Sequence, residues 1–245
     1  MKKQKKIFLG VIILILISSL SIIIYKNKNK NDFKKFMIVD NINNQKETKN
    51  NYQEEITKLQ EEYNNKDIVG TLEIEGTDYK VPIVQGTDNK FYLTHLPNKE
   101  YSIMGSIFLD YRVNINASKK LLIFGHNSKT MDMPFKILEN YYDIDYIKNH
   151  PYAIIKTKEK IRKYEIFSLY VAINDYKYMN VNFSEKEYKE HINYLRNKSI
   201  YNIETNIGDN DNILILQTCS THKDYKNYKK KYLVVAFYEI NLDNK

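Results

Sequence analysis

Cys219 has the clearest potential for covalent chemistry, because it is the only cysteine among the 245 residues of the chain. The thiolate is the reactive, nucleophilic form of a cysteine side chain. Cys219 follows an apolar run at 213–216 and precedes a polar segment at 220–231, so we expect it at the C-terminal end of a buried strand. A free cysteine is often only a small buried hydrophobic residue. The polar segment that begins at the next position favours instead a thiol presented for reaction.

His126 is the best-placed partner for this thiol, since a nucleophilic cysteine needs a base or a cation beside it. It ends a second apolar run, at 121–124, and the intervening Gly125 lets the backbone turn. His222 lies in the polar segment after the cysteine. The other three histidines have ordinary surface or helix contexts: His95, His150 and His191. Two reactive side chains at strand ends indicate nucleophilic catalysis. No Cys or His pair has metal-ligand spacing, so we expect no metal.

Eight short apolar runs, separated by turn residues, predict a mainly β fold, either a barrel or a sandwich. They lie at 68–74, 79–84, 105–109, 121–124, 152–155, 164–171, 213–216 and 232–238. Three helices are expected around them, at 51–63, 132–142 and 184–196. The second would begin with an aspartate cap and Pro134 in its first turn. The third opens with Ser184 and Glu187 at the spacing of a capping box.

The N-terminus contains a segment long and apolar enough to cross a membrane. Residues 7–24 would rise about 27 Å as a helix, close to the ~30 Å of a hydrocarbon core. A cleaved signal peptide is the alternative, but no Ala-x-Ala-like site follows. We therefore expect a basic tail at 1–6, a single-pass transmembrane anchor at 7–25, a juxtamembrane stalk at 26–50 and a catalytic domain at 51–245. Lysines flank both ends of the apolar run and only slightly favour a cytoplasmic N-terminus with the domain outside the cell.

The net charge of +8 does not indicate a nucleic-acid-binding protein. Residues 1–30 contain seven lysines and no acidic residue, and the rest of the chain has 31 basic residues against 30 acidic ones. A nucleic-acid footprint would instead be clustered on the folded domain. The basic excess belongs to the segment expected at the membrane, and we expect no nucleic-acid partner.

Several segments, in chain order, resemble those of class B sortases, a family of cysteine transpeptidases. Leu-Gln-Thr-Cys at 216–219 is similar to the family's Thr-x-Thr-Cys, with leucine in place of the first threonine. Phe-Gly-His-Asn at 124–127 is similar to Tyr-Gly-His-Asn. Gly-Ser-Ile-Phe-Leu-Asp-Tyr-Arg at 105–112 is similar to Gly-Ser-Ile-Phe-Met-Asp-Tyr-Arg. The segments at 81–85 and 133–135 also fit, and the resemblance covers about residues 47–240.

The resemblance implies a closed eight-stranded sortase-type β-barrel with an N-terminal helical extension and a helix inserted before the last two strands. It implies that Cys219 attacks the threonine carbonyl of a sorting signal similar to Asn-Pro-x-Thr-x, and that His126 protonates the leaving amine. The surface protein bearing that signal would pass to an amine of a lipid-linked cell-wall precursor or of a pilin. The resemblance also implies that no cofactor is needed and that Thr218 helps to shape the oxyanion site. Asn89 and Ser220 are candidates for substrate contact.

The chain departs from the family at its third catalytic residue, an arginine that opens the last strand. The arginines of this chain are Arg112, Arg162 and Arg196. None of them follows Cys219. Lys231 is expected in the arginine position, with Lys230 or Lys229 there if the register differs. Lysine offers a point charge and not a planar fork of donors, so Lys231 is either the cation that stabilises the oxyanion or a solvated cation of a lysine-rich loop.

Two other functions are compatible with the sequence. A sortase-fold surface domain that binds sorting signals or partners without turnover would account for the missing arginine. A hydrolytic cysteine protease of another fold would also use Cys219 as its nucleophile. For such a protease, a papain-like layout does not fit, because the histidine precedes the cysteine and the chain has short strands and few helices.

Overall fold

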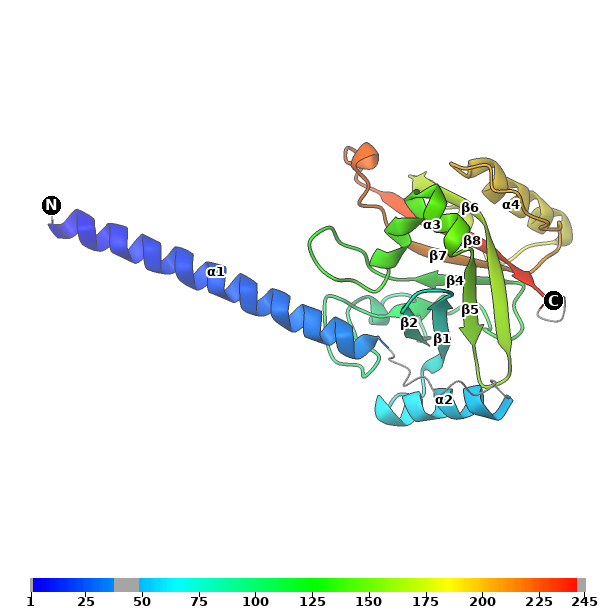
Figure 1. Ribbon diagram of the computed structural model, residues 1–245, viewed down its shortest axis with the longest axis horizontal. Coiled ribbons are helices and arrows are strands. Elements are labelled where there is room, and N and C mark those ends of the chain that lie inside the picture. Colours follow the sequence, from blue (N-terminus) through cyan, green and yellow to red (C-terminus); the bar gives the residue numbers. More distant parts are fainter. Residues whose placement is uncertain (1, 38–48, 242–245) are drawn as a thin grey trace.

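The eight apolar runs form eight strands, which close into one barrel (Figure 1). The computed structural model describes residues 2–37 and 49–241. The strands are β1 (Ile68–Ile74), β2 (Lys80–Val84), β3 (Ile107–Leu109), β4 (Lys120–Phe124), β5 (Tyr152–Lys156), β6 (Ile161–Ile173), β7 (Ile213–Cys219) and β8 (Lys231–Ile240). Their order around the barrel is β1-β2-β3-β4-β7-β8-β6-β5. The expected closed eight-stranded barrel is confirmed.

The pairing of β4 with β7 matters most for the site. These two strands are parallel neighbours, although they are far apart in the sequence, and Phe124 pairs with Gln217 at the end of their ladder. Because parallel strands run in the same direction, the residues that follow them emerge at the same edge of the sheet. On its other side β7 pairs with β8 in antiparallel fashion, and Cys219 lies opposite Tyr232.

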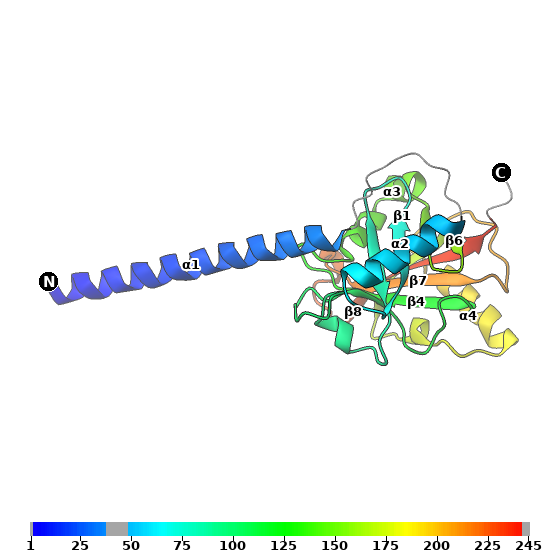
Figure 2. The same ribbon diagram turned by 90° about the horizontal axis from the view of Figure 1, so that it is seen from below.

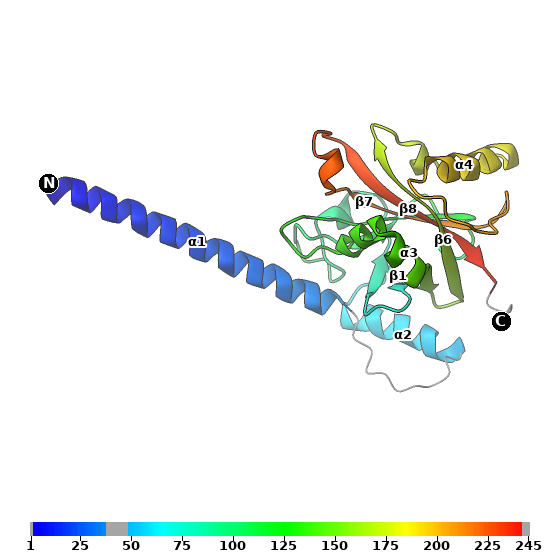
Figure 3. The same ribbon diagram turned by 45° about the horizontal axis from the view of Figure 1, so that its top comes forward.

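Alternate side chains of these strands enter two separate cores, as the period of two requires. Leu214 and Leu216 of β7 belong to the core that fills the barrel. Ile213 and Ile215 belong to a second core on the outer face of the barrel, which helices α2 (Lys49–Glu62) and α4 (Glu185–Lys198) cover. Figure 2 shows α2 crossing the barrel beside β1, and Figure 3 shows α4 along β6. Burial on both faces explains why the β7 run is apolar throughout.

Two of the three expected helices around the barrel are confirmed. Helix α2 (Lys49–Glu62) buries Ile56 and Leu59 of its apolar stripe. Helix α4 (Glu185–Lys198) begins with the expected capping box, in which the Ser184 side chain and the Glu187 side chain each accept a hydrogen bond from the other residue's backbone N–H. It lies between β6 and β7, before the last two strands. A short further helix, α3, spans Ile144–Asn149.

The expected start of the helix at 132–142 is wrong. Residues 132–135 are not helical, and a 3-10 helix, η2, covers Lys136–Tyr142. The Tyr79 hydroxyl donates to the Pro134 carbonyl (2.7 Å) and the Phe135 N–H donates to the His126 carbonyl (2.9 Å). These bonds tie the segment to the barrel, so its backbone cannot wind into a helical turn. They also place η2 beside the segment that carries His126.

The N-terminal helix α1 (Lys2–Phe36) projects away from the barrel (Figure 1). Its stretch Gly10–Lys28 is long and apolar enough to cross a membrane, by length and composition, and its side chains are exposed. A membrane anchor and a signal sequence both fit this helix. The helix continues past residue 25 into the expected stalk, and residues 38–48 of that stalk lie outside the described residues.

Candidate active site

Cys219 and His126 emerge together at the edge where β4 and β7 end. The Gly125 N–H donates to the Gln217 carbonyl (3.1 Å), and the Thr218 hydroxyl donates to the Gly125 carbonyl (2.7 Å). These two bonds carry the parallel pairing beyond the last residue of β4. His126 therefore follows β4 in step with Cys219 at the end of β7. Cys219 is exposed, so its thiol is accessible to a substrate.

A hydrogen bond to the backbone sets the orientation of the His126 ring. Its Nε2 lies 2.8 Å from the carbonyl oxygen of Leu93, in the 3-10 helix η1 (Phe91–Leu93). A carbonyl oxygen only accepts, so Nε2 carries the proton and donates it. The other ring nitrogen, Nδ1, is then the one that can take up or release a proton during a reaction.

Glu139 of η2 connects the two loops that follow β4 and β7. Its carboxylate accepts hydrogen bonds from the Asn127 side-chain amide and from the Thr221 N–H, both at 2.7 Å. The Asn127 amide also donates to the Cys219 carbonyl (3.0 Å). These contacts hold the backbone of the cysteine against the loop of the histidine. The motif at 124–127 contained Asn127 without indicating this role, and nothing in the sequence pointed to Glu139.

Thr218 and Ser220 flank the cysteine with buried hydroxyl groups. Thr218 is fully buried and bonded to Gly125, and Ser220 is buried with its hydroxyl 2.8 Å from that of Tyr142. Both side chains bind other parts of the protein and so stabilise the backbone around Cys219. Their predicted roles in shaping the oxyanion site and contacting substrate stay predictions.

The electrostatic environment of Cys219 combines burial with one nearby cation. Protein atoms crowd one side of the thiol, and this desolvation raises the pKa of Cys219, while the Lys231 ammonium lowers it by a smaller amount. Lys231 opens β8, as expected, and its Nζ donates to the Tyr225 carbonyl (2.8 Å) in the loop between β7 and β8. Lys231 thus acts on the thiolate through space while a loop carbonyl holds its ammonium group.

Replacing Lys231 with methionine is expected to make the thiol less reactive at neutral pH. Loss of the cation disfavours the thiolate, so the pKa of Cys219 rises further and the inflection in alkylation rate moves to higher pH. The interaction between the Lys231 ammonium group and the thiolate is partly exposed and therefore weak. Its loss should lower the alkylation rate at pH 7 about two- to fivefold. The pH dependence of iodoacetamide alkylation, followed by intact mass, measures it. Lys226→Met, in the same loop, is the matched control, and an equal shift there would show that only overall loop charge matters.

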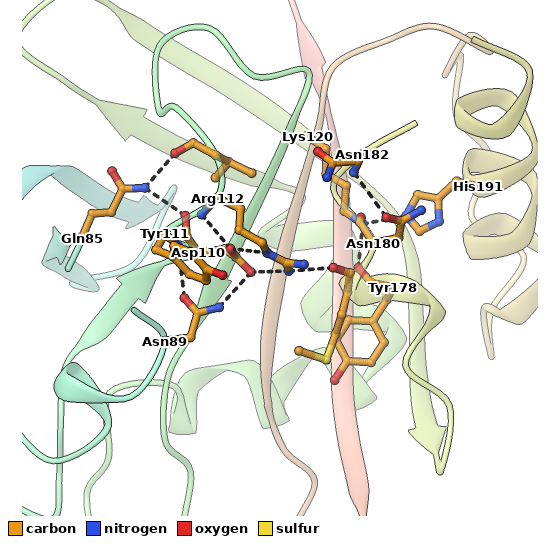
Figure 4. A network of polar contacts seen from close by, with 12 residues as sticks. Gln85, Asn89, Asp110, Tyr111, Arg112, Lys120, Tyr178, Asn180, Asn182 and His191 are labelled. Atoms are coloured by element: carbon orange, nitrogen blue, oxygen red, sulfur yellow. Dashed lines mark hydrogen bonds and ion pairs between the residues drawn. The ribbon is translucent and has the colours of Figure 1, made fainter. Parts of the chain in front are cut away.

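A polar network beside the site holds the segment around the 3-10 helix η3 (Lys177–Met179) (Figure 4). The buried Lys120 Nζ donates to the carbonyls of Tyr178 and Asn180, both at 2.6 Å, and contacts His191 Nε2 at 2.8 Å. Burial first, and then Lys120, lower the pKa of His191 to about 3, so its ring is neutral and accepts. Burial also lowers the pKa of Lys120 well below its usual value. All three donors of the ammonium group have partners.

Asn89 and Arg112 complete this network from the other side. Arg112 forms an ion pair with the buried Asp110 (2.6 Å) and donates to the Met179 carbonyl (2.9 Å). The Asn89 amide donates to Asp110 (3.0 Å), and its oxygen accepts from the Tyr111 N–H (3.1 Å). Asn89 thus braces the segment that carries Arg112, as Figure 4 shows. Its predicted contact with substrate stays a prediction.

Lys120→Met is expected to lower the free energy of unfolding by about 2–4 kcal/mol, because the buried Tyr178 carbonyl and the partly buried Asn180 carbonyl lose their donor. The η3 segment should then loosen. Urea unfolding measures the loss, and hydrogen exchange of residues 177–182 locates it. Lys119→Met, at the exposed neighbouring position, should change stability by less than about 0.5 kcal/mol. An unchanged urea midpoint for Lys120→Met would mean that the carbonyls do not depend on this side chain.

Comparison with known proteins agrees with this geometry. A family model described as Sortase domain matches residues 72–239. Sortase B of Listeria monocytogenes is 35% identical over 164 residues, which cover 66% of this chain and 66% of that relative, just under two thirds. Sortase B of Staphylococcus aureus is 31% identical over 176 residues, which cover 70% of each protein.

Among solved structures, a Cys-to-Ser mutant of Clostridium perfringens sortase B is similar to this chain with a TM-score of 0.70 at 28% identity. The match covers 79% of this chain and 90% of that chain. The region matched by the family model contains β4 and β7 with His126 and Cys219 at their ends. The chain belongs to the sortase family of cysteine transpeptidases, in class B.

Proposed function

We propose that the chain is an active sortase that cleaves a C-terminal sorting signal similar to Asn-Pro-x-Thr-x after its threonine and transfers the protein to an amine. One observation carries this proposal. Cys219 and His126 follow two adjacent parallel strands in step, at an exposed edge. A nucleophile and a proton-transfer group held by one rigid sheet are the elements that acyl transfer through a thioester requires.

The steps follow from these groups. The Cys219 sulfur attacks the threonine carbonyl carbon, and the carbonyl electrons move to oxygen. When the carbonyl re-forms, the carbon–nitrogen bond breaks, and His126 Nδ1 gives a proton to the leaving amine. The incoming amine then attacks the thioester and His126 takes up its proton. The Cys219 thiolate leaves, and a new amide bond replaces the old one.

The N-terminal helix supports a location for this reaction. We infer that α1 is a single-pass anchor with a cytoplasmic N-terminus and that the barrel lies outside the cell. The barrel would then be tethered near the membrane surface, within reach of surface proteins that carry sorting signals and of lipid-linked cell-wall precursors or pilin amines. The apolar stretch Gly10–Lys28 supports the anchor.

Intact mass spectrometry of the full chain in detergent tests the proposal. Incubation with a panel of sorting-signal peptides should add the mass of the acyl part to Cys219, and an added amine should remove it as a new amide. Iodoacetamide serves as the accessibility control. No adduct across the panel, from protein whose thiol alkylates normally, would contradict an active sortase. Release of the free acid in the presence of amine would identify a protease.

A non-catalytic surface domain is the second candidate, because two observations favour it. No arginine follows Cys219, and the pKa of its thiol is raised. In that case the peptides would bind to the wild-type chain without an adduct and without turnover.

A further inference from the structure

The strand register shows which side chains share the face of the sheet on which Cys219 lies. Directly opposed residues of neighbouring strands point to the same face, and successive residues alternate. Cys219 is opposed by Tyr232 of β8. On the other side of β7, Phe124 of β4 is paired with Gln217. Two residues further along both segments, His126 comes level with Cys219. His126, Cys219 and Tyr232 therefore lie in one row across the ends of β4, β7 and β8, with His126 two residues beyond the end of β4.

The two cores confirm which faces these rows occupy. In β7, Ile213 and Ile215 lie on the same face of the strand as Cys219, and they belong to the outer core. In β8, Val234 and Ala236 belong to the same outer core, and Tyr232 packs against it. Leu233 of β8 belongs to the core inside the barrel.

Lys231 lies in the row of Leu233, which is the opposite face from that of Cys219. Its ammonium group is directed to the Tyr225 carbonyl (2.8 Å). Tyr232, and not Lys231, is thus the β8 side chain that shares the face of the nucleophile.

The spacing between Cys219 and Tyr232 is the closer of the two kinds found in antiparallel sheets. The Ser220 N–H donates to the Lys231 carbonyl (3.1 Å), so the neighbouring pair of residues is the hydrogen-bonded one. Cys219 and Tyr232 then form a non-hydrogen-bonded pair, in which the side chains approach each other more closely.

The electrostatics agree with this proximity. Partial burial, Tyr176 and the Cys219 thiolate all raise the pKa of Tyr232. The ring of Tyr176 lies 6.1 Å from that of Tyr232, measured between centroids. The Tyr176 contribution includes a side-chain hydrogen bond with Tyr232. The Tyr232 phenol keeps its proton at neutral pH, and to donate to an oxyanion it would turn from Tyr176 to that oxygen.

We propose that the Tyr232 hydroxyl donates a hydrogen bond to the oxyanion that forms when Cys219 attacks a carbonyl, an inference that rests on the proposed function. The carbon–sulfur bond forms while the carbonyl electrons move to oxygen, and that oxygen accepts from Tyr232. When the carbonyl re-forms, the bond weakens and Tyr232 keeps its own proton throughout. A neutral donor in the row would supply the stabilisation that the absent arginine cannot, while Lys231 acts on the thiolate from the other face.

The test compares reactions that form an oxyanion with one that does not, in the full chain in detergent. Acylation of Cys219 by a sorting-signal peptide or by p-nitrophenyl acetate passes through an oxyanion, whereas alkylation by iodoacetamide does not. In Tyr232→Phe, acylation by the peptide should fall about a hundred- to a thousandfold, the usual effect of losing one oxyanion donor. Acylation by the ester should fall at least about tenfold, and alkylation should stay within about twofold.

Two further variants complete the experiment. Tyr228→Phe, an exposed tyrosine of the loop before β8, is the matched control and should leave all three rates unchanged. Tyr232→Arg should recover most of the peptide acylation, because a guanidinium group also donates hydrogen bonds from that position.

The proposal is overturned if Tyr232→Phe leaves ester acylation unchanged, or if it lowers acylation and alkylation equally. The second result would assign Tyr232 to the thiolate or to the fold. A wild-type chain that reacts with the ester but with no peptide would contradict the proposed substrate. The ratio of ester acylation to alkylation would still decide the role of Tyr232.

Discussion

Cys219→Ala is expected to lower transpeptidation by at least about 10⁴-fold and to abolish the covalent adduct, because removing a nucleophile leaves only binding and electrostatic stabilisation. The chain has no other cysteine, so no second thiol can replace it. Product formation followed by chromatography, and intact mass for the adduct, measure the two effects. Iodoacetamide labelling should disappear in the same variant, which provides an internal check.

The fold should tolerate this change. Cys219 is exposed at the end of β7, so its removal leaves no cavity, and the free energy of unfolding should change by less than about 0.5 kcal/mol. A sorting-signal peptide should bind Cys219→Ala about as tightly as the wild type. Cys219→Ser is the companion variant, since it keeps the shape but offers a hydroxyl in place of a thiolate. Turnover that persists in both variants would show that another group is the nucleophile.

The barrel could be predicted from the sequence because each of its strands coincides with an apolar run of residues. Strands β4 and β7 are buried on both faces, between the barrel interior and the outer core under α2 and α4. Such runs are short, continuous and bounded by polar residues. The ends of β4 and β7 were therefore visible, and with them the two side chains that carry the proposed chemistry.

Contacts that depend on tertiary structure could not be predicted in this way. An aspartate and a proline at 132–134 look like the start of a helix, but bonds from Tyr79 and to the His126 carbonyl hold that segment in another conformation. The bond between Glu139 and the Thr221 N–H joins residues that are 82 positions apart. Nothing local in the sequence encodes it.

The register of β8 was a second feature that could not be predicted from the sequence. The sequence shows where the run begins, and Lys231 does open the strand. A shift of one residue moves every side chain to the other face of a sheet. The choice between Lys231 and Tyr232 as the residue beside Cys219 therefore needs the pairing itself, which places Tyr232 opposite the cysteine.

His126→Gln is expected to lower kcat/KM for peptide transpeptidation by about 10²–10⁴-fold, which is the usual contribution of a general acid or base. The leaving amine of a peptide needs a proton, and the variant has no group at this position that can give one. Glutamine is the conservative choice, because its amide can still donate to the Leu93 carbonyl as Nε2 does. Initial rates over a range of peptide concentrations separate kcat from KM.

A substrate with a better leaving group distinguishes proton transfer from a structural role for His126. Nitrophenolate leaves p-nitrophenyl acetate without being protonated, so acylation by this ester should fall much less in His126→Gln than acylation by the peptide. His222→Gln is the matched control, because His222 follows Cys219 by three residues and lies in the loop, where its ring packs against Tyr142. It should lower both rates by less than about threefold, as expected for a residue outside the proton path. Equal losses on ester and peptide in His126→Gln would mean that His126 positions or ionises the thiol and does not protonate the leaving amine.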